Sequence, residues 1–144
     1  MAVRIRRMRA SDLKALAAIE RGITGSRRTS ALQGHLRRQL RAGGGICLVA
    51  DVAGKPAGFL VGDVAPWEFG EEREVAWVKV VGVDPRHQGL GLGQLLGQAF
   101  LKQVRARGIR RVKTLVEWNA GDLVAYFQSL GFNRGGAIIL ERSV

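Results

Sequence analysis

The sequence has few of the residues that mark several common protein classes. Its 144 residues include 1 cysteine, 3 prolines, 2 histidines and 1 tyrosine. A single cysteine excludes an internal disulfide, and it gives no metal-ligand spacing with two histidines, so we expect no metal site. The longest clearly apolar run, residues 46–50, is far below the roughly 20 residues that cross a bilayer. We therefore expect no membrane contact.

Acidic residues are also scarce. The chain has 12 acidic and 23 basic side chains, which gives a net charge of +11. A positive field suits a polyanionic partner such as nucleic acid, the ribosome or a phosphorylated cofactor. The arginines are scattered along the chain, however, which also fits a basic composition with no particular partner. The arginine-rich first ten residues lack the apolar centre of a signal peptide, so we expect a cytoplasmic protein.

Hydrophobic periodicity divides the chain into alternating strands and helices, with no linker or repeat between them. One domain over residues 1–144 is therefore expected. In the first strand the alternation places Arg4 and Arg6 on a solvent-facing side, and Ser11 is expected to cap the first helix. The expected strands are 2–8, 46–52, 57–64, 73–83, 109–118 and 135–144, and the expected helices are 11–20, 30–41, 93–107 and 122–130.

This order of elements predicts the fold class. Three strands follow the first two helices, and a short turn at residues 53–56 (AGKP) joins the first two of them into an antiparallel hairpin. A strand, a helix and a strand then form a crossover. The sequence predicts a mixed α/β (α+β) domain with an antiparallel N-terminal meander.

One stretch is richer in glycine than its position explains. Residues 81–96 (VGVDPRHQGLGLGQLL) hold four glycines between an expected strand and an expected helix. Glycine weakens both kinds of element. The N-terminus of a helix carries unpaired N–H groups and a partial positive charge, and glycines leave these donors uncovered. The stretch therefore predicts a backbone cradle for a phosphate or pyrophosphate, or else a tightly packed turn without a ligand.

The spacing of these glycines distinguishes between phosphate-binding motifs. A P-loop needs Lys and then Ser or Thr after its last glycine, but Gln94 follows Gly93 here. The dinucleotide fingerprint needs a third glycine where this chain has Leu96. The pattern that fits is Q-x-x-G-x-G, formed by Gln88, Gly91 and Gly93.

This motif, after a strand ending in VGVDP, resembles the acetyl-CoA-binding motif of the GNAT (Gcn5-related N-acetyltransferase) superfamily. A second stretch, WNAGDLVAYFQSLGF at residues 118–132, is similar to the Asn–helix–Tyr–x–x–Leu–Gly–Phe ending of those enzymes. The order of elements also matches, so the resemblance covers essentially the whole chain. It implies a GNAT fold with a mixed central sheet, splayed central strands and about four helices, and acetyl-CoA (coenzyme A) as the cofactor.

The resemblance also implies where the cofactor binds. The pantetheine arm would pair with the backbone of the strand ending at residues 81–83, in the gap before the next strand. The pyrophosphate would rest on amides of residues 88–94. Asn119 would bind the arm, cap the following helix, or do both. The expected cofactor-binding residues are Val81, Gly82, Val83, Gln88, Gly89, Leu90, Gly91, Leu92, Gly93, Gln94 and Asn119.

The implied chemistry is direct attack of an amine on a thioester. It needs a base for the amine, donors for the oxyanion and a proton for the leaving sulfur. The family's tyrosine register, counted back from Gly131, holds Phe127 here, and Tyr126 is one residue earlier. One residue turns a helical side chain by about 100°, so Tyr126 is either the general acid or a core tyrosine. Glu74 and Glu117 are either the base or solvated surface charges.

The resemblance places the acceptor site at the first two helices and the loop between them. Arg27 and Arg28 in this loop fit a basic wall, and Trp67 and Phe69 either line the same cleft or pack in the core. Lys79, in the middle of an expected strand, must reach water or an acidic group, which indicates an open cleft.

The function expected from the resemblance is an acetyl-CoA-dependent N-acetyltransferase. Its acceptor would be the primary amine of a small molecule or a peptide or protein N-terminus. One alternative is acetylation of a ribosomal protein N-terminus, which the positive charge would favour. Another is a non-catalytic module that binds acyl-CoA or nucleic acid. The family also makes a homodimer an expectation.

Overall fold

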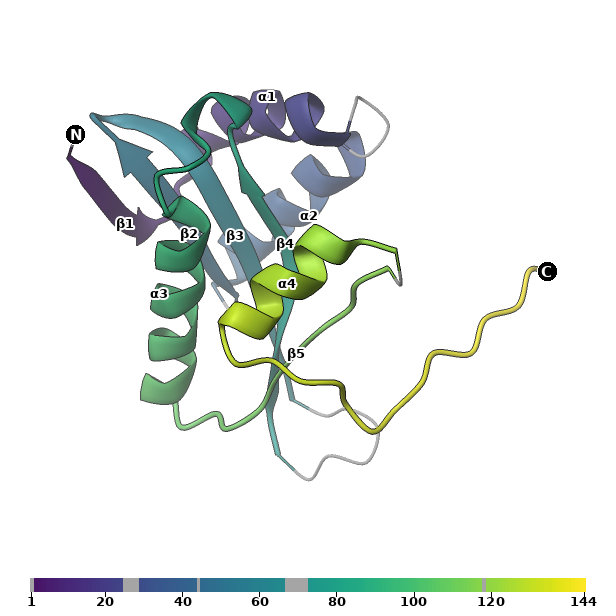
Figure 1. The fold of residues 1–144 in the computed structure, drawn as a ribbon. Coiled ribbons are helices and arrows are strands. Elements are labelled where there is room, and N and C mark those ends of the chain that lie inside the picture. Colours follow the sequence, from purple (N-terminus) through teal and green to yellow (C-terminus); the bar gives the residue numbers. More distant parts are fainter. Residues whose placement is uncertain (1, 25–28, 44, 67–72, 118) are drawn as a thin grey trace.

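The structure is a computed structural model that describes residues 2–24, 29–43, 45–66, 73–117 and 119–144. In these residues the chain forms one five-stranded sheet and four α-helices (Figure 1). The elements are β1 (Val3–Arg7), α1 (Leu13–Thr24), α2 (Thr29–Ala42), β2 (Ile46–Val52), β3 (Lys55–Ala65), β4 (Val75–Val83), α3 (Leu92–Ala106), β5 (Val112–Thr114) and α4 (Gly121–Ser129), with short 3-10 turns η1 (Ala10–Asp12) and η3 (Pro85–His87).

The sheet has the strand order β1-β2-β3-β4-β5. The first four strands pair antiparallel with their neighbours, and β5 pairs parallel with β4 after the crossover through α3. The tight turn between β2 and β3 uses Ala53 and Gly54, both with positive φ. The predicted meander, crossover and mixed fold class are therefore confirmed.

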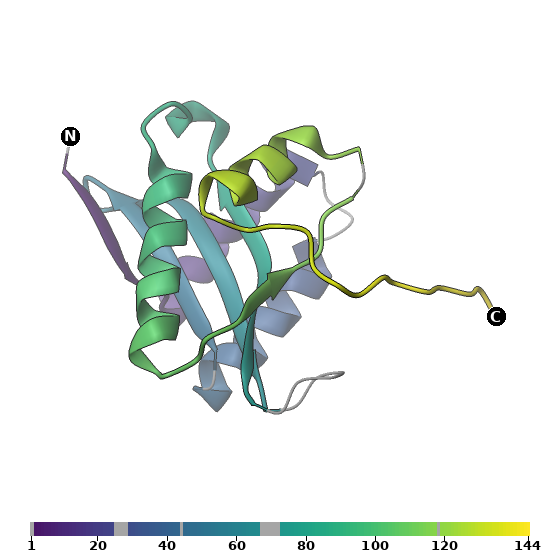
Figure 2. The same cartoon turned by 60° about the horizontal axis from the view of Figure 1, so that its bottom comes forward.

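Helices cover both faces of the sheet, and each face has its own apolar core. In Figures 1 and 2, α3 and α4 lie on one side and α1 and α2 on the other. Leu96 and Phe100 of α3 pack against β2, β3 and β4, while Leu16 and Leu36 pack against Phe59 and its neighbours on the opposite face. These four helical side chains are at most 1% exposed. The helices thus follow from amphipathic spacing, as predicted.

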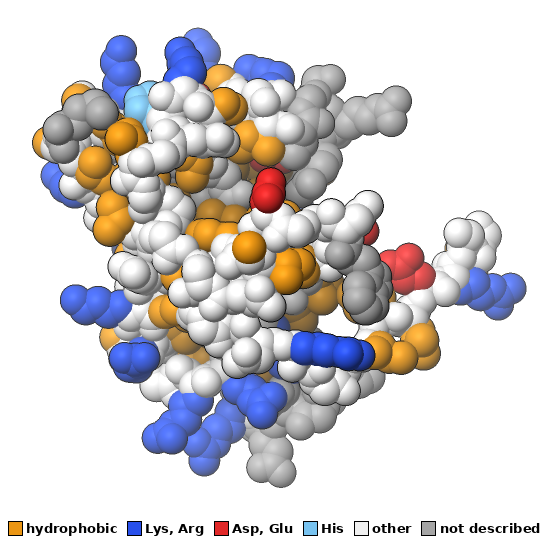
Figure 3. Space-filling model, viewed as in Figure 1, with side chains coloured by type: hydrophobic (Ala, Val, Ile, Leu, Met, Phe, Trp, Pro, Cys, Tyr) orange, Lys and Arg blue, Asp and Glu red, His pale blue; other side chains and the backbone are white. Residues whose placement is uncertain are grey.

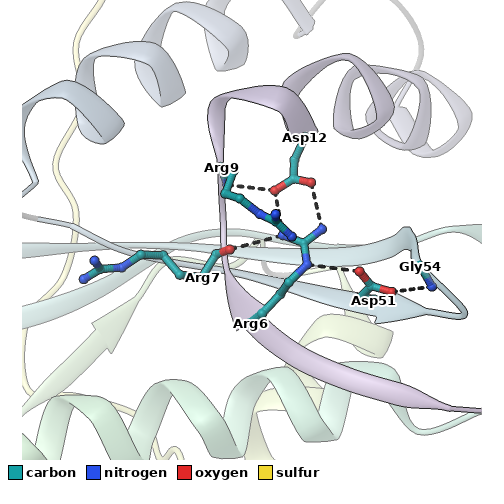
Figure 4. Close-up of polar contacts among 6 residues, drawn as sticks. All are labelled: Arg6, Arg7, Arg9, Asp12, Asp51 and Gly54. Atoms are coloured by element: carbon teal, nitrogen blue, oxygen red, sulfur yellow. Dashed lines mark hydrogen bonds and ion pairs between the residues drawn. The ribbon is translucent and has the colours of Figure 1, made fainter.

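A buried ionic cluster ties β1 to the rest of the N-terminal half (Figure 4). Arg6 donates two hydrogen bonds to the Asp12 carboxylate, at 2.8 and 2.9 Å, and one from Nε to Asp51 Oδ2 at 3.0 Å. The two carboxylates also accept the N–H groups of Arg9 and Gly54. The hydrogen bonds from Arg6 hold the pKa of Asp12 and of Asp51 below the ordinary value, and the two carboxylates raise the pKa of Arg6.

This cluster corrects two predictions from the sequence. Arg4 is exposed as expected, but the side chain of Arg6 is only 11% exposed. Simple alternation fails here because the partner Asp51 is 45 residues away in the sequence. The N-cap residue of the helical segment is Arg9 rather than Ser11, and the Asp12 carboxylate accepts the Arg9 backbone N–H.

The C-terminal half also departs from the prediction. The strand expected at 109–118 is restricted to β5, and the strand expected at 135–144 does not form. Residues 133–144 instead leave α4 as an extended segment that projects away from the sheet (Figures 1 and 2). Ile138 and Leu140 in this segment are 77% and 86% exposed. The prediction of a strand at 135–144 is therefore wrong: the segment is extended but does not pair with the sheet.

Candidate functional site

Strands β4 and β5 run side by side for three residue pairs and then separate. Ala76–Val78 pair with Val112–Thr114, but β4 continues to Val83. At the last pair, the Thr114 hydroxyl donates to the Val78 carbonyl oxygen at 3.0 Å. Beyond this point, in the part of the chain that the structure describes, β5 offers β4 no further pairing. The splayed central strands implied by the resemblance are therefore present.

A β-bulge lies directly after the last paired residue of β4. On the other side of β4, Gly62 of β3 pairs with Val78, whereas Val61 pairs with Val80. Lys79 is therefore an extra residue without a partner on β3. Such a bulge bends the strand and shifts its alternation by one residue. Lys79 is exposed, as its charge requires.

The shifted alternation determines which backbone groups of β4 face the gap. The Asp84 N–H donates to the Ala57 carbonyl of β3 at 2.8 Å. Because successive strand residues point their backbone groups to opposite sides, Gly82 also faces β3, and Val81 and Val83 point away from it. Their N–H and C=O groups are aimed into the gap that β5 leaves open. The structure thus presents an edge of unpaired β4 backbone.

A short loop connects this edge to α3, and Asp84 fixes its start. The Asp84 carboxylate accepts hydrogen bonds from the Arg86 backbone N–H at 3.0 Å and from the Arg86 guanidinium. These bonds lower the pKa of Asp84 below its ordinary value. The Asp84 carbonyl accepts the His87 N–H, which closes the η3 turn. The loop therefore leaves the strand in a defined direction.

Glycines then open the loop around the first turn of α3. Gly89 and Gly91 have φ values of +86° and +75°, and a Cβ added to either would meet no atom within 4 Å. The first helical hydrogen bond runs from the Leu95 N–H to the Gly91 carbonyl. The N–H groups of the three residues before Leu95 lie in the first helical turn and have no helical acceptor. A bare, positively polarised helix start follows the gap directly.

The side chains of this loop divide between solvent and core. Leu92 is 1% exposed and belongs to the α3-side core, whereas Leu90 is 42% exposed. Gln88 is also exposed. The Gln94 side chain donates to the Ser129 hydroxyl of α4. The side chains of the loop thus share no single direction, and the groups that every predicted pyrophosphate-binding position can offer are backbone groups.

Position 93 requires glycine for packing, unlike positions 89 and 91. A Cβ there would come within 3.2 Å of the Tyr126 ring, so glycine allows α4 to pack against the first turn of α3. The Tyr126 hydroxyl donates to the Gly93 carbonyl at 2.7 Å, and burial raises the Tyr126 pKa to about 12. Phe127 is 6% exposed in the α3-side core. The helix register thus aims Tyr126 at α3 and Phe127 into the core.

The candidate carboxylates lie on opposite sides of the point where the strands separate. Glu74 is exposed and precedes β4, four residues before Val78, which is roughly 13 Å along an extended chain. Glu117 is exposed and follows β5 by three residues, on the segment that leaves the sheet. The structure therefore does not bring the two together. Asn119 is exposed, and the N-cap of α4 is Ala120.

The expected acceptor site is described only in part. Arg27, Arg28, Trp67 and Phe69 lie outside the described residues. A cavity of about 460 Å³ adjoins the loop, and its lining was not foreseen from the sequence because it joins distant segments. Those residues are Ala15, Ala18, Ile19, Gly22, Lys55, Pro56, Asp84, Pro85 and Arg86. Within the described ranges, no group of three metal-binding side chains is found and no helix is long and apolar enough to span a membrane.

Comparison with known proteins gives a family and a fold. The model of the Acetyltransferase (GNAT) family matches residues 13–132. A mycothiol acetyltransferase of Amycolatopsis mediterranei (strain U-32) is 40% identical over 89 residues, and one of Thermobispora bispora is 35% identical over 94 residues. These matches cover 60% and 65% of this chain but only 29% and 32% of the relatives. The chain thus spans about a third of their length.

Solved structures resemble the whole chain at low sequence identity. The aminoglycoside N-acetyltransferase AAC(6')-Iy in complex with CoA superposes with a TM-score of 0.85 at 17% identity, covering 99% of this chain and 95% of that one. A transcriptional regulator from Bacillus halodurans C-125 superposes with a TM-score of 0.84, also at 17% identity, over 99% of this chain and all of that one, 100%. At this identity the likeness establishes the fold.

Proposed function

Because this chain belongs to the acetyltransferase (GNAT) family, we propose that it is an N-acetyltransferase that uses acetyl-CoA to acetylate a primary amine. One observation carries the proposal. The backbone edge at Val81 and Val83 leads through two positive-φ glycines into the bare N-terminus of α3. This surface matches an elongated ligand with amide groups at one end and a diphosphate at the other.

Each part of the surface has a defined role in the proposal. The N–H and C=O groups of Val81 and Val83 pair with the amides of the pantetheine arm, as a strand added to an open edge pairs. The amides of residues 88–94 hold the pyrophosphate, since helix N-termini favour anions. The groups proposed to hold this ligand are mostly backbone N–H and C=O groups. Acetyl-CoA, when bound, would supply the activated thioester. A main-chain N–H near Val81 is the proposed donor to the oxyanion.

The acid and the base are predictions of unequal strength. Glu117 is the preferred base because it follows the point along the chain at which β5 separates from β4, whereas Glu74 precedes the paired segment of β4. Tyr126 stays a candidate general acid. Its hydroxyl proton is directed at the Gly93 carbonyl, however, which favours a packing role and a leaving sulfur protonated by solvent.

We propose a small-molecule amine as the acceptor. The names of the relatives support this class, since the curated ones are mycothiol acetyltransferases and the structural ones include aminoglycoside N-acetyltransferases. A peptide or protein N-terminus is the alternative acceptor. Lys and Arg side chains are spread around the margins of the face in Figure 3 rather than gathered in one patch. On that face the basic side chains therefore give little support to docking on nucleic acid or the ribosome. A cytoplasmic location agrees with acetyl-CoA as the proposed donor.

A homodimer is a further part of the proposal. Strand β5 is an edge of the sheet, Leu115 beyond it is 64% exposed, and Ile138 and Leu140 project from the same half of the molecule. Unpaired edges and exposed apolar strands favour association between copies. Light scattering of the chain and of an Ile138→Lys/Leu140→Lys variant tests this. We expect a dimer that the double variant dissociates, and a monomeric parent chain would contradict the proposal.

A matched pair of glycine variants tests the cofactor cradle. Gly91 and Gly108 both have positive φ, +75° and +78°, and both have open space where a Cβ would be added, but only Gly91 lies in the cradle. Valine should strain both sites by about 1–2 kcal/mol. With coenzyme A at 100 times its Kd, the melting temperature of the parent should rise by roughly 5–10 °C. Gly91→Val should abolish this rise and Gly108→Val should retain it.

The outcomes separate binding from catalysis. If Gly91→Val binds coenzyme A as tightly as Gly108→Val, the cradle assignment is wrong. Release of free thiol from acetyl-CoA, screened over small amines and short peptides, then tests the reaction itself. A chain that binds coenzyme A and releases no thiol with any amine would be the non-catalytic module.

A further inference from the structure

Thr114 occupies the last position at which β4 and β5 remain together. Its hydroxyl donates to the Val78 carbonyl at 3.0 Å, across 36 residues of sequence. The Thr114 side chain is half-buried, and the two residues that follow, Leu115 and Val116, are 64% and 39% exposed. The chain thus leaves the sheet surface directly after this contact.

The Thr114–Val78 hydrogen bond uses the carbonyl that the next backbone pair between β4 and β5 would use. The paired segment begins with the Ala76 N–H donating to the Arg111 carbonyl. In a parallel ladder the pattern repeats every two residues, so the Val78 carbonyl is the acceptor that the Leu115 N–H reaches if the strands stay together. The Thr114 side chain supplies a donor to that same oxygen. A side-chain bond therefore satisfies the carbonyl where the backbone pairing ends.

The register of β4 against β3 also shifts directly after Val78. Lys79, the bulge residue of β4, follows Val78 immediately, and the Val81 backbone is the first beyond it to face the gap. The gap therefore starts between Val78 and Val81. In the proposed function, this is where the pantetheine arm ends and the thioester begins.

We infer that Thr114 is a positioning residue for the cofactor: by bonding to Val78, its hydroxyl fixes where the two strands separate and how far the gap extends. This inference rests on the proposed function. The Thr114 hydroxyl is bonded to the Val78 carbonyl, and Thr114 lies outside the pyrophosphate cradle at residues 88–94. It acts through the β4 backbone, by keeping the Leu115 segment from pairing along β4 and narrowing the gap.

The test compares two substitutions of nearly equal shape. Thr114→Val keeps the branched side chain and removes the hydroxyl that competes with the Leu115 N–H for the Val78 carbonyl, so we expect the pairing to extend to Leu115. We expect the amides of Leu115 and Val116 to exchange at least tenfold more slowly with solvent. The Kd for coenzyme A and the KM for acetyl-CoA should rise about fivefold, the scale of one hydrogen bond, while kcat stays within twofold. Thr114→Ser, which keeps the hydroxyl, should restore most of the affinity.

A purely structural role gives a different result. In that case Thr114→Val lowers the melting temperature and leaves the Kd, the KM and the exchange of Leu115 unchanged, which overturns the inference. If the parent chain does not bind coenzyme A at all, the proposed function fails instead. Hydrogen exchange at Leu115 then still decides whether the hydroxyl ends the ladder.

Discussion

The two edges of the sheet differ in how their polar groups are paired. At the β1 edge, Arg6 makes four hydrogen bonds and joins two carboxylates, so buried charge is fully paired. Beside the β5 edge, the pairing of β4 with β5 ends at Val78, and the backbone groups of Val81 and Val83 have no partner on β5 among the described residues. If the proposed cofactor site is correct, stability and binding depend on separate parts of this fold. Substitutions at one edge should therefore leave the other largely unaffected.

The largest effect should come from breaking the ionic cluster. Arg6→Ala leaves Asp12 and Asp51, with side chains only 6% and 11% exposed, without their cation. Loss of one partner from a buried pair costs about 3–5 kcal/mol of unfolding free energy. Urea denaturation measures this loss, with Arg7→Ala, an exposed neighbour on β1, as the control. If the two variants are equally stable, the cluster does not stabilise the fold.

The same substitution tests whether the edges are independent. At a temperature where Arg6→Ala is still folded, its Kd for coenzyme A should stay within about twofold of the parent, because the substituted edge does not touch the gap. Isothermal titration measures this value. A Kd that rises in step with the loss of stability would show that the two edges are coupled.

The acid stability of the protein should depend on the β1 edge. Asp12 and Asp51 have pKa values lowered by Arg6, so in the unfolded chain they bind protons more readily than in the folded one. Their contribution is fully present above the ordinary carboxyl pKa of about 4 and is lost as the pH falls through the lowered values. Melting temperatures between about pH 6 and pH 2 should fall steeply for the parent. In Arg6→Ala the melting temperature should depend less on pH over this range. An identical dependence in the two proteins would contradict the assignment.

A smaller effect is expected beside the open edge. Tyr126→Phe removes the hydroxyl bond to the Gly93 carbonyl, a net loss of about 1 kcal/mol. We expect kcat to change less than tenfold, because the hydroxyl supports α3 from α4. A general acid would be worth roughly 100-fold or more in kcat. A loss of that size without a change in stability would assign Tyr126 to the chemistry.

The smallest effect should come from Lys79. Its ammonium lies 5.3 Å from the centroid of the Trp77 ring. Exposed cation–π pairs contribute about 0.5–1 kcal/mol, so Lys79→Met should lower the unfolding free energy by no more than that. Urea denaturation checks this. A much larger loss would mean that Lys79 also stabilises the bulge itself.

Local patterns predicted much of this molecule. Amphipathic spacing located all four helices, and apolar alternation located five strands but also predicted one at 135–144 that does not form. The glycines between β4 and α3 pointed to an open helix start. Each of these depends on neighbours in the sequence. The loop carries its own conformational signature, because only glycine takes positive φ at residues 89 and 91 without strain.

What the sequence did not reveal depends on distant partners. Arg6 looked like a surface residue because Asp51 is far along the chain, and Thr114 looked like an ordinary strand residue because its role depends on the Val78 carbonyl. The bulge was hidden as well, since a run of valines on both sides of Lys79 gives no sign of a change in alternation. The apolar pattern at 135–144 predicted a strand that does not form, because pairing depends on a neighbouring strand and not on the pattern alone.

The bulge lets β4 hold one residue more than β3 without changing which side of the strand faces the core. Ala76 and Val78 contact the same apolar core as Val81 and Val83, although odd and even positions of a regular strand face opposite ways. Lys79 is the extra residue that accounts for this change of parity. Deleting Lys79 would therefore place Val78 and Val80 in regular alternation, leave Val81 and Val83 on the same side, and remove the bend that the bulge introduces. A one-residue deletion should thus be tolerated at this position, whereas elsewhere in β4 it would reverse the side chains of the residues that follow.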